Sequence, residues 1–316
     1  MTDDKMLISM TLNPAIDKLI EVDEFRYGGM NRIDTKLVKI AAKGYHVALS
    51  YQILGGSSFC LGFSFRHNRI MTEKFFLQNS LPNEFVELQG DLRVNLKLKD
   101  KSTGRITEIN DKGTEIGKKD LGTVFDLFRK YISEAGMFVF TGSLPPGVYP
   151  EIYSDMIAEA LKQGKKSALD AEGIPLLKGI ESKPYVVKAN TYEIERTFGI
   201  KIMDTAGAVA VCREINKMGV KIACVTLGER GAVISDSDKI YTAAPPAGLT
   251  AVINTVGAGD AFLGALCREI SLGHSTEDML RSGMAAASAR VTNQDDRYFD
   301  FFKYEIFRES IEVKEI

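Results

Sequence analysis

A run of apolar residues long enough to cross a membrane is missing from this sequence of 316 residues, and its first residues lack the basic and apolar regions of a signal peptide. Charge of one sign is not in excess either, because 40 Lys and Arg residues stand against 42 Asp and Glu residues and give a formal net charge of -2. This balance argues against nucleic acid or an acidic membrane as the main partner.

Cysteine and histidine are few and scattered. The four cysteines, Cys60, Cys212, Cys224 and Cys267, lie among apolar neighbours without metal-ligand spacing, which favours buried free thiols. The three histidines are far apart in the chain and form no metal motif. Repeats, low-complexity segments and a convincing interdomain linker are also missing. We therefore expect a cytoplasmic protein in which residues 1–316 form a single domain.

What the sequence does contain is a regular alternation of short apolar strands and helical patterns. Strands are expected at 6–12, 18–22, 33–40, 58–63, 137–141, 167–169, 185–188 and 222–227, a hairpin at 232–243, and a short strand or frayed tail at 312–316. Helices are expected at about 43–54, 121–132, 149–163, 207–218, 261–267 and 284–290. This order predicts an α/β fold with a mostly parallel sheet and helices on both faces.

One hairpin stands apart from this alternation. Every second side chain from Val94 to Leu98 is apolar, and every second side chain from Arg93 to Lys99 is basic or polar, so the two kinds lie on opposite faces of a strand. Residues 105–110 alternate in the same way and form the returning strand of the hairpin. The basic face is either an ordinary solvated surface or a lid over an anionic substrate. Because such a hairpin is not stable alone, its apolar face must pack on something, for which a second subunit is one candidate.

The most informative stretch lies between Asn254 and Gly264. Gly257 and Gly259 follow a β-branched run and precede a helical pattern, so the N–H groups of the helix's first turn, with the positive end of the helix dipole behind them, suit an anion such as phosphate. Asp260 would repel a resting phosphate unless it takes a proton from a group that attacks that phosphate. The alternative is that Asp260 is a plain helix-start residue favoured by the dipole.

Polar and glycine residues also follow several of the predicted strands. Because the carboxyl ends of parallel strands share one rim, these residues are expected to line a common ligand site. They are Asp17, Gly142, Ser143, Asp170, Asn190, Glu193 and Gly228. Lys43 is unusual in another way, since a cation near a helix start is disfavoured, so it is either solvated or paired with an anion.

These stretches resemble a known family. The segment Asn254-Thr255-Val256-Gly257-Ala258-Gly259-Asp260 is similar to the signature near the C-terminus of the ribokinase-like (PfkB) sugar kinases. Thr11-Leu12-Asn13-Pro14-Ala15-Ile16-Asp17 resembles the opening of its 1-phosphofructokinase and tagatose-6-phosphate kinase branch. Further similar motifs occur at 107–110, 142–147, 188–193 and 226–232, in the family's order, so the resemblance covers nearly the whole chain.

The resemblance implies a ribokinase-like fold and a kinase activity. The fold would be a Rossmann-like domain with a small β-sheet lid formed by segments of about 17–40 and 91–110, usually joined into a homodimer through the lid. The activity would be transfer of the γ-phosphoryl group of ATP, with Mg²⁺, to a hydroxyl of a sugar phosphate such as fructose 1-phosphate or tagatose 6-phosphate.

The resemblance also implies a role for each matching residue. Asp260 matches the catalytic base, and the anion hole around the transferring phosphoryl group matches Gly257, Ala258 and Gly259. Asp17 matches a residue that binds sugar hydroxyls, and the substrate side further includes Lys43, Arg93, Asn95 and Ser143. The nucleotide side matches Lys188, Asn190, Glu193, Thr226 and Gly228, with Glu193 reaching the metal through water.

The departures from the family pattern lie mostly on the acceptor side. Where the family has Gly-Gly-Lys-Gly-x-Asn, this chain has Ala41-Ala42-Lys43-Gly44-Tyr45-His46, so two glycines have gained methyl groups and an amide has become an imidazole. The segment 64–67 replaces a glycine pair, and Ala189 stands where proline is common. Two alternatives therefore stay open: a sugar-phosphate binding or sensor protein with negligible kinase activity, and a kinase for an unphosphorylated sugar or nucleoside. Lys43 and Arg93 count against the second.

Overall fold

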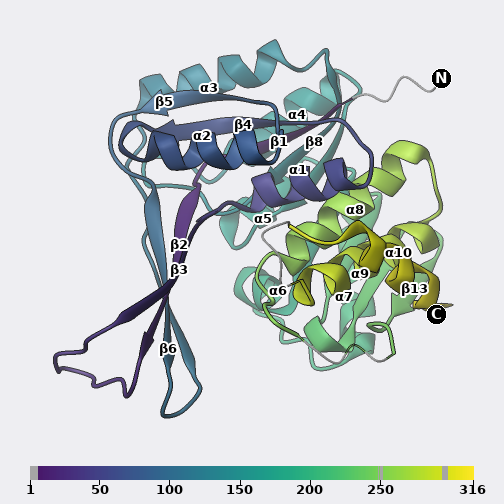
Figure 1. The fold of residues 1–316 in the computed structure, drawn as a ribbon. Coiled ribbons are helices and arrows are strands. Elements are labelled where there is room, and N and C mark those ends of the chain that lie inside the picture. Colours follow the sequence, from purple (N-terminus) through teal and green to yellow (C-terminus); the bar gives the residue numbers. More distant parts are fainter. Residues whose placement is uncertain (1–5, 248, 250–251, 294–297) are drawn as a thin grey trace.

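The structure is a computed structural model that describes residues 6–247, 249, 252–293 and 298–316 (Figure 1). These residues form one large and one small sheet, with helices packed on the large one. The small sheet projects from one end of the large sheet, at the lower left of Figure 1. None of the helices in these ranges is both long and apolar enough to cross a membrane.

The large sheet has ten strands within the described residues, in the order β14-β13-β12-β11-β10-β9-β8-β1-β4-β5. Seven neighbouring strands run parallel: β5 (Asn83–Leu88), β4 (Ser58–Phe65), β1 (Met6–Thr11), β8 (Ala135–Thr141), β9 (Lys166–Asp170), β10 (Val186–Asn190) and β11 (Ile222–Thr226). The antiparallel strands that extend one edge are β12 (Ala232–Ser235), β13 (Ile240–Ala243) and β14 (Val313–Glu315). Side chains such as Leu7, Ile8 and Phe138 are fully buried because the sheet is covered on both faces.

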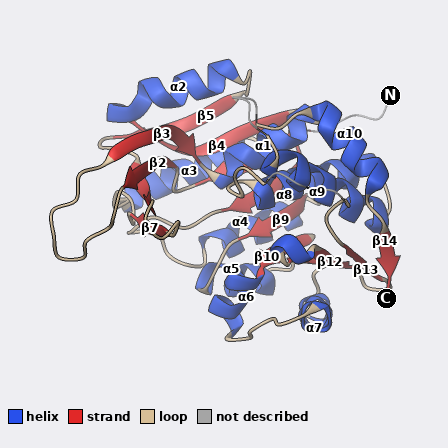
Figure 2. Cartoon of the chain, turned by 60° about the horizontal axis from the view of Figure 1, so that its bottom comes forward, coloured by secondary structure: helices blue, strands red, loops and turns tan. Residues whose placement is uncertain are grey.

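Helices connect and cover these strands. They are α1 (Lys43–Ile53), α2 (Arg69–Gln78), α3 (Lys118–Lys130), α4 (Ile152–Lys162), α5 (Ile174–Glu181), α6 (Thr191–Phe198), α7 (Thr205–Lys217), α8 (Ala258–Leu272), α9 (Thr276–Val291) and α10 (Phe301–Ser310). Figure 2 shows α2 on one side of β4 and β5 and α3 on the other. Helix α1 packs against α8, and α8 packs against α9. The expected α/β fold with helices on both faces is therefore confirmed.

Most of the expected elements lie within a few residues of their ranges, but β5, α2, α5, α6 and α10 lie where none was expected, and the helix expected at 261–267 extends over the whole of α8. The helix expected from residue 149 begins at Ile152, because Pro150 disfavours a helical conformation at the residue before it. The helix expected at 284–290 extends over the whole of α9, where the Ser275 side chain caps the first turn by accepting from the N–H of Asp278. The charged ending forms a strand, β14.

The small sheet has the order β3 (Asp34–Ala41), β2 (Ala15–Val22), β6 (Arg93–Asp100) and β7 (Ile106–Asn110). Its strands occupy the two segments that the resemblance assigns to a lid. Strands β2 and β6 are parallel, and their register places Asp17 beside Asn95. Because strand side chains alternate, one face carries these polar residues, and the other carries a small buried cluster of Ile20, Val22 and Leu98.

Candidate active site

The glycine turn before helix α8 is shaped by two different constraints. Gly257 is the N-cap of α8 and has φ 85°, a left-handed conformation that favours glycine. Gly259 has no such constraint, but a Cβ atom there would lie 2.9 Å from Nζ of Lys188. The ammonium group of Lys188 therefore packs directly on the turn. Of the three expected donors in this turn, the N–H of Ala258 already donates to the carbonyl of Thr255 at 3.2 Å.

Asp260 lies in the first turn of α8 and is buried, with 6% of its surface exposed. Its Oδ2 atom lies 3.1 Å from Nδ1 of His46 on α1, and that imidazole is equally buried. Asp260 borders a cavity of ≈ 930 Å³. Half of the predicted site residues line this cavity: Asp17, Lys43, Arg93, Asn95, Ser143, Glu193 and Asp260.

The polar face of the small sheet forms the wall of the cavity on which acceptor residues are expected. Asp17 accepts from Nδ2 of Asn95 at 3.1 Å and from Nζ of Lys97 at 2.9 Å. Arg93 donates to the side chain of Asn95 and, at 3.1 Å, to the carbonyl of Asn13. The register of β2 and β6 thus gathers one carboxylate and several donors at a single place, which suits a polyhydroxylated and anionic ligand.

Several cations lie around Asp17 on this wall. Burial lowers the pKa of Lys39, which is paired with Asp17 across β2 and β3, and the charges of Arg290 and Lys97 lower it further. These cations and Arg93 repel one another, although the carboxylates of Asp17, Glu108 and Asp111 also line this side of the cavity. An anionic group on a bound ligand would relieve this repulsion.

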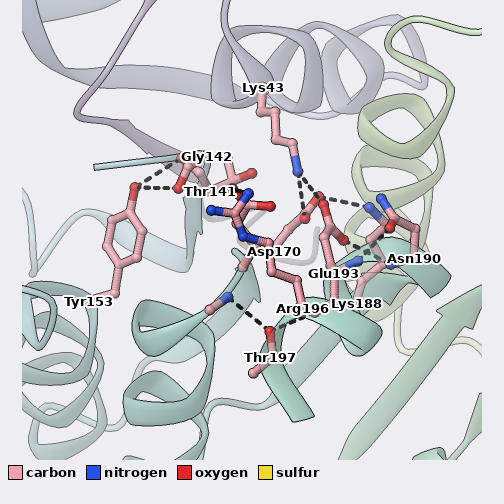
Figure 3. A network of polar contacts seen from close by, with 12 residues as sticks. Lys43, Thr141, Gly142, Tyr153, Asp170, Lys188, Asn190, Glu193, Arg196 and Thr197 are labelled. Carbon is pink, nitrogen blue, oxygen red and sulfur yellow. Dashed lines mark hydrogen bonds and ion pairs between the residues drawn. The ribbon is translucent and has the colours of Figure 1, made fainter. Parts of the chain in front are cut away.

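A network of two lysines and two carboxylates joins α1 to the ends of β9 and β10 (Figure 3). Nζ of Lys43 lies 3.0 Å from Asp170 and 2.7 Å from Glu193, and Nζ of Lys188 lies 2.9 Å from Asp170. Burial alone would lower the pKa of Lys43, but these carboxylates and Asp260 outweigh it and hold that pKa well above its usual range. Burial would likewise raise the pKa of Asp170, but Lys188 and Lys43 outweigh it and lower that pKa. Lys43 therefore has anionic partners, which the sequence left open.

The residues expected on the nucleotide side lie next to this network. Asn190 and Glu193 form a reciprocal capping box at the start of α6, in which each side chain accepts from the other's backbone N–H. Asn190 is paired with Thr226 across β10 and β11. Gly228 follows in a left-handed conformation with φ 63°. These residues share one end of the sheet, but Lys188, Asn190, Thr226 and Gly228 do not line the cavity that contains Asp260.

Three residues of the site were not among the expected ones. Lys97 lies two residues after Asn95 and four after Arg93, so the alternation of that strand already placed it on the same face as these two residues. His46 was noted only as a departure from the family pattern. Tyr298, whose hydroxyl donates to the carbonyl of Gly257 at 2.6 Å, had no signal in the sequence.

A mostly parallel α/β sheet with a small second sheet over a polar cavity, and an aspartate just after a glycine turn in its wall, defines a class of protein, the ribokinase-like phosphotransferases. The model of the pfkB family carbohydrate kinases matches residues 44–299, and the chain belongs to this family. It is therefore an ATP-dependent kinase that phosphorylates a carbohydrate hydroxyl.

Individual relatives agree with this assignment. The 1-phosphofructokinase of Bacillus subtilis (strain 168) is 31% identical over 291 residues, which are 92% of this chain and 94% of the relative. The 1-phosphofructokinase of Escherichia coli (strain K12) is 28% identical over 291 residues, 92% of each chain. Phosphofructokinase-2 from Escherichia coli in complex with potassium has a TM-score of 0.86 at 25% identity, covering 96% of this chain and 98% of the other.

Proposed function

We propose that this kinase transfers the γ-phosphoryl group of ATP to a hydroxyl of a ketohexose monophosphate, of the fructose 1-phosphate or tagatose 6-phosphate type. The observation that carries the proposal is one cavity of ≈ 930 Å³ lined both by Asp260 and by the basic face of the small sheet. Two 1-phosphofructokinases that are 31% and 28% identical to this chain support the same acceptor class.

In this proposal Asp260 is the general base. The acceptor hydroxyl gives its proton to Asp260 as its oxygen attacks the γ-phosphorus, and the bond from that phosphorus to the bridging oxygen breaks to release ADP. The turn of Gly257, Ala258 and Gly259, together with the Lys188 ammonium beside it, would hold the transferring group. Phosphoryl transfer needs positioning and charge neutralisation more than covalent help, and these residues supply both.

The small sheet would act as the lid that binds the acceptor. Asp17 would accept hydrogen bonds from sugar hydroxyls, while Arg93, with Asn95 and Ser143 nearby, would bind the phosphate that the acceptor already carries. Lys43 was expected near that phosphate, but its ammonium is paired with Asp170 and Glu193. We therefore assign the main phosphate contact to Arg93, whose hydrogen bonds are to neutral groups.

Mg²⁺ would accompany ATP. Among the described residues, no group of three or more His, Cys, Asp or Glu side chains could hold a metal ion by itself. Mg²⁺ does not need such a group, because it is usually bound by one or two carboxylates together with waters and substrate phosphates. Glu193 would hold it through water, with Asp170 as a neighbouring carboxylate, while Lys188, Asn190, Thr226 and Gly228 would surround the nucleotide.

We further propose that two chains form a homodimer through their lids. The face of the small sheet opposite Asp17 carries a row of Val38, Lys18, Leu96 and Ile109 across its four strands, in which Val38 and Ile109 are 46% and 53% exposed. A two-sided sheet of four strands is rarely stable with an apolar face in water, so a second lid is a suitable cover.

A kinase assay over a panel of sugars and sugar phosphates tests the acceptor, and Asp260→Asn tests the base. We expect turnover with a ketohexose monophosphate, and a loss of kcat of about 10²- to 10⁴-fold in Asp260→Asn with little change in the KM for ATP. Asp120→Asn, which changes a first-turn aspartate on α3, is the control. No turnover on the whole panel would refute the proposed activity, and near-normal turnover of Asp260→Asn would refute its role as base.

A further inference from the structure

His46 and Asp260 form a buried imidazole–carboxylate pair that the general-base proposal does not use. Nδ1 of His46 lies 3.1 Å from Oδ2 of Asp260, and both residues are 6% exposed. The pair bridges α1 and α8, which approach so closely that a Cβ atom on Gly264 would lie 2.5 Å from the carbonyl oxygen of Val47. The hydroxyl of Ser50 also donates to the carbonyl of Ala261 across the same contact, so the two partners are held on fixed elements.

The imidazole is held in place by a second ring. The rings of His46 and Tyr298 are stacked, with centroids 4.9 Å apart and planes inclined by 16°. The Tyr298 hydroxyl donates to the carbonyl of Gly257 at 2.6 Å, and the guanidinium of Arg290 lies 5.1 Å from the centre of the same ring. Tyr298 therefore contacts both His46 and the glycine turn that precedes Asp260.

The chemistry of the pair fixes the direction of its hydrogen bond. An ionised carboxylate only accepts, so Nδ1 must carry the proton when Asp260 is ready to act as a base. The bond then holds Oδ2 and leaves Oδ1 to receive the proton of the acceptor hydroxyl. A base that cannot rotate presents its free oxygen in one direction, which keeps the acceptor in a reactive geometry.

We infer that His46 is a positioning residue for Asp260, and that Tyr298 couples it to the phosphoryl-binding turn. This inference rests on the proposed role of Asp260 as base. The imidazole replaces an amide that is usual for the family, and it keeps a hydrogen-bond donor at the same place on α1.

The experiment compares His46→Leu and His46→Asn, because the amide nitrogen of asparagine can take the place of Nδ1 without titrating. We expect His46→Leu to lower kcat by about 10- to 100-fold while the KM for ATP is nearly unchanged, and His46→Asn to recover most of that loss. His67→Leu is the matched control, because His67 forms a similar imidazole–carboxylate pair with Asp91, at 3.0 Å, on the exposed surface.

Two outcomes would overturn the inference. They are a normal kcat in His46→Leu, and an equal loss of kcat in His46→Leu and His46→Asn. Asp260→Asn, measured alongside, separates this inference from the function on which it rests. If Asp260→Asn is inactive while His46→Leu is normal, the role of His46 fails and the base stands; if Asp260→Asn is active, the base itself fails.

Discussion

At the scale of single residues, Arg93 is where the acceptor's identity can be tested. Its guanidinium is fixed by the carbonyl of Asn13 and by the side chain of Asn95, so it has little freedom to lose when it binds an anion. A hydrogen bond between charged groups contributes about 1.5–3 kcal/mol, which corresponds to roughly 10- to 100-fold in affinity. Arg93→Ala should therefore raise the KM of a phosphorylated ketohexose by that factor, with a much smaller effect on an unphosphorylated one.

The comparison needs two controls. Steady-state kinetics with both acceptors separates phosphate binding from a general loss of the lid. Lys101→Ala removes a cation in the turn just after β6 that is paired with Asp23 and does not line the cavity, and it should leave both KM values unchanged. Equal increases for the two acceptors in Arg93→Ala would argue against recognition of a phosphate by this residue.

Single residues also show how far the sequence can lead. Asp260 could be recognised as a candidate site residue because the two glycines and the helical pattern that point to an anion site are its immediate neighbours in the sequence. The contact between His46 and Asp260 could not be predicted, because 214 positions separate the two residues and only the packing of α1 on α8 brings them together. The same holds for Lys43, whose charge alone suggested a partner, while Asp170 and Glu193 lie 127 and 150 positions away.

At the scale of elements, the network around Asp170 ties α1, β9, β10 and α6 together. Lys188 and Asp170 are almost completely buried, so removing one partner leaves charge in a poorly solvated place. Lys188→Met should reduce the free energy of unfolding by about 3 kcal/mol, measured by urea denaturation near neutral pH. Lys130→Met, which breaks a surface pair with Glu84, should cost less than about 1 kcal/mol and is the control.

The pH dependence of this loss follows from the directions of the shifts. The lowered pKa of Asp170 contributes stability that is present above its unfolded value of about 4 and is lost as pH falls through the lower folded value. The raised pKa of Lys188 contributes stability below about pH 10, which is lost as pH rises through the higher folded value. The gap between the unaltered protein and Lys188→Met should thus be widest between these limits. A gap independent of pH would contradict an electrostatic origin.

Elements with strong patterns were predicted well, and weakly patterned ones were not. Strand β6 was found with its two faces correctly assigned because its alternation is strict. Helix α2 carried no expectation, since it buries only Thr72 and Phe76 and the rest of its surface is at least partly exposed. The register of β2 beside β6, which sets Asp17 against Asn95, depends on a parallel pairing across 78 positions that no local pattern encodes.

At the scale of the whole molecule, the two faces of the small sheet would have different tasks in the proposed dimer. The polar face contains Asp17 and Arg93, and the opposite face carries the exposed apolar side chains of Val38, Val94 and Ile109. If a second lid covers the apolar face, it holds the polar face in position over the cavity. Assembly and acceptor binding would then be coupled through one four-stranded sheet, although no residue of the apolar face touches the acceptor.

Ile109→Glu tests that coupling, because a charge on this half-exposed position is tolerated by the single chain but must be desolvated in a dimer. Analytical ultracentrifugation should show a mass of two chains for the unaltered protein and a dissociation constant raised at least about 100-fold in the variant. At concentrations where Ile109→Glu is monomeric, the KM for the acceptor should rise while the KM for ATP stays near normal. Leu161→Glu places the same charge on an equally exposed leucine of α4, away from the lid, and should change neither. A monomeric unaltered protein would contradict the proposed dimer. A monomeric variant with an unchanged acceptor KM would contradict the coupling between dimer formation and acceptor binding.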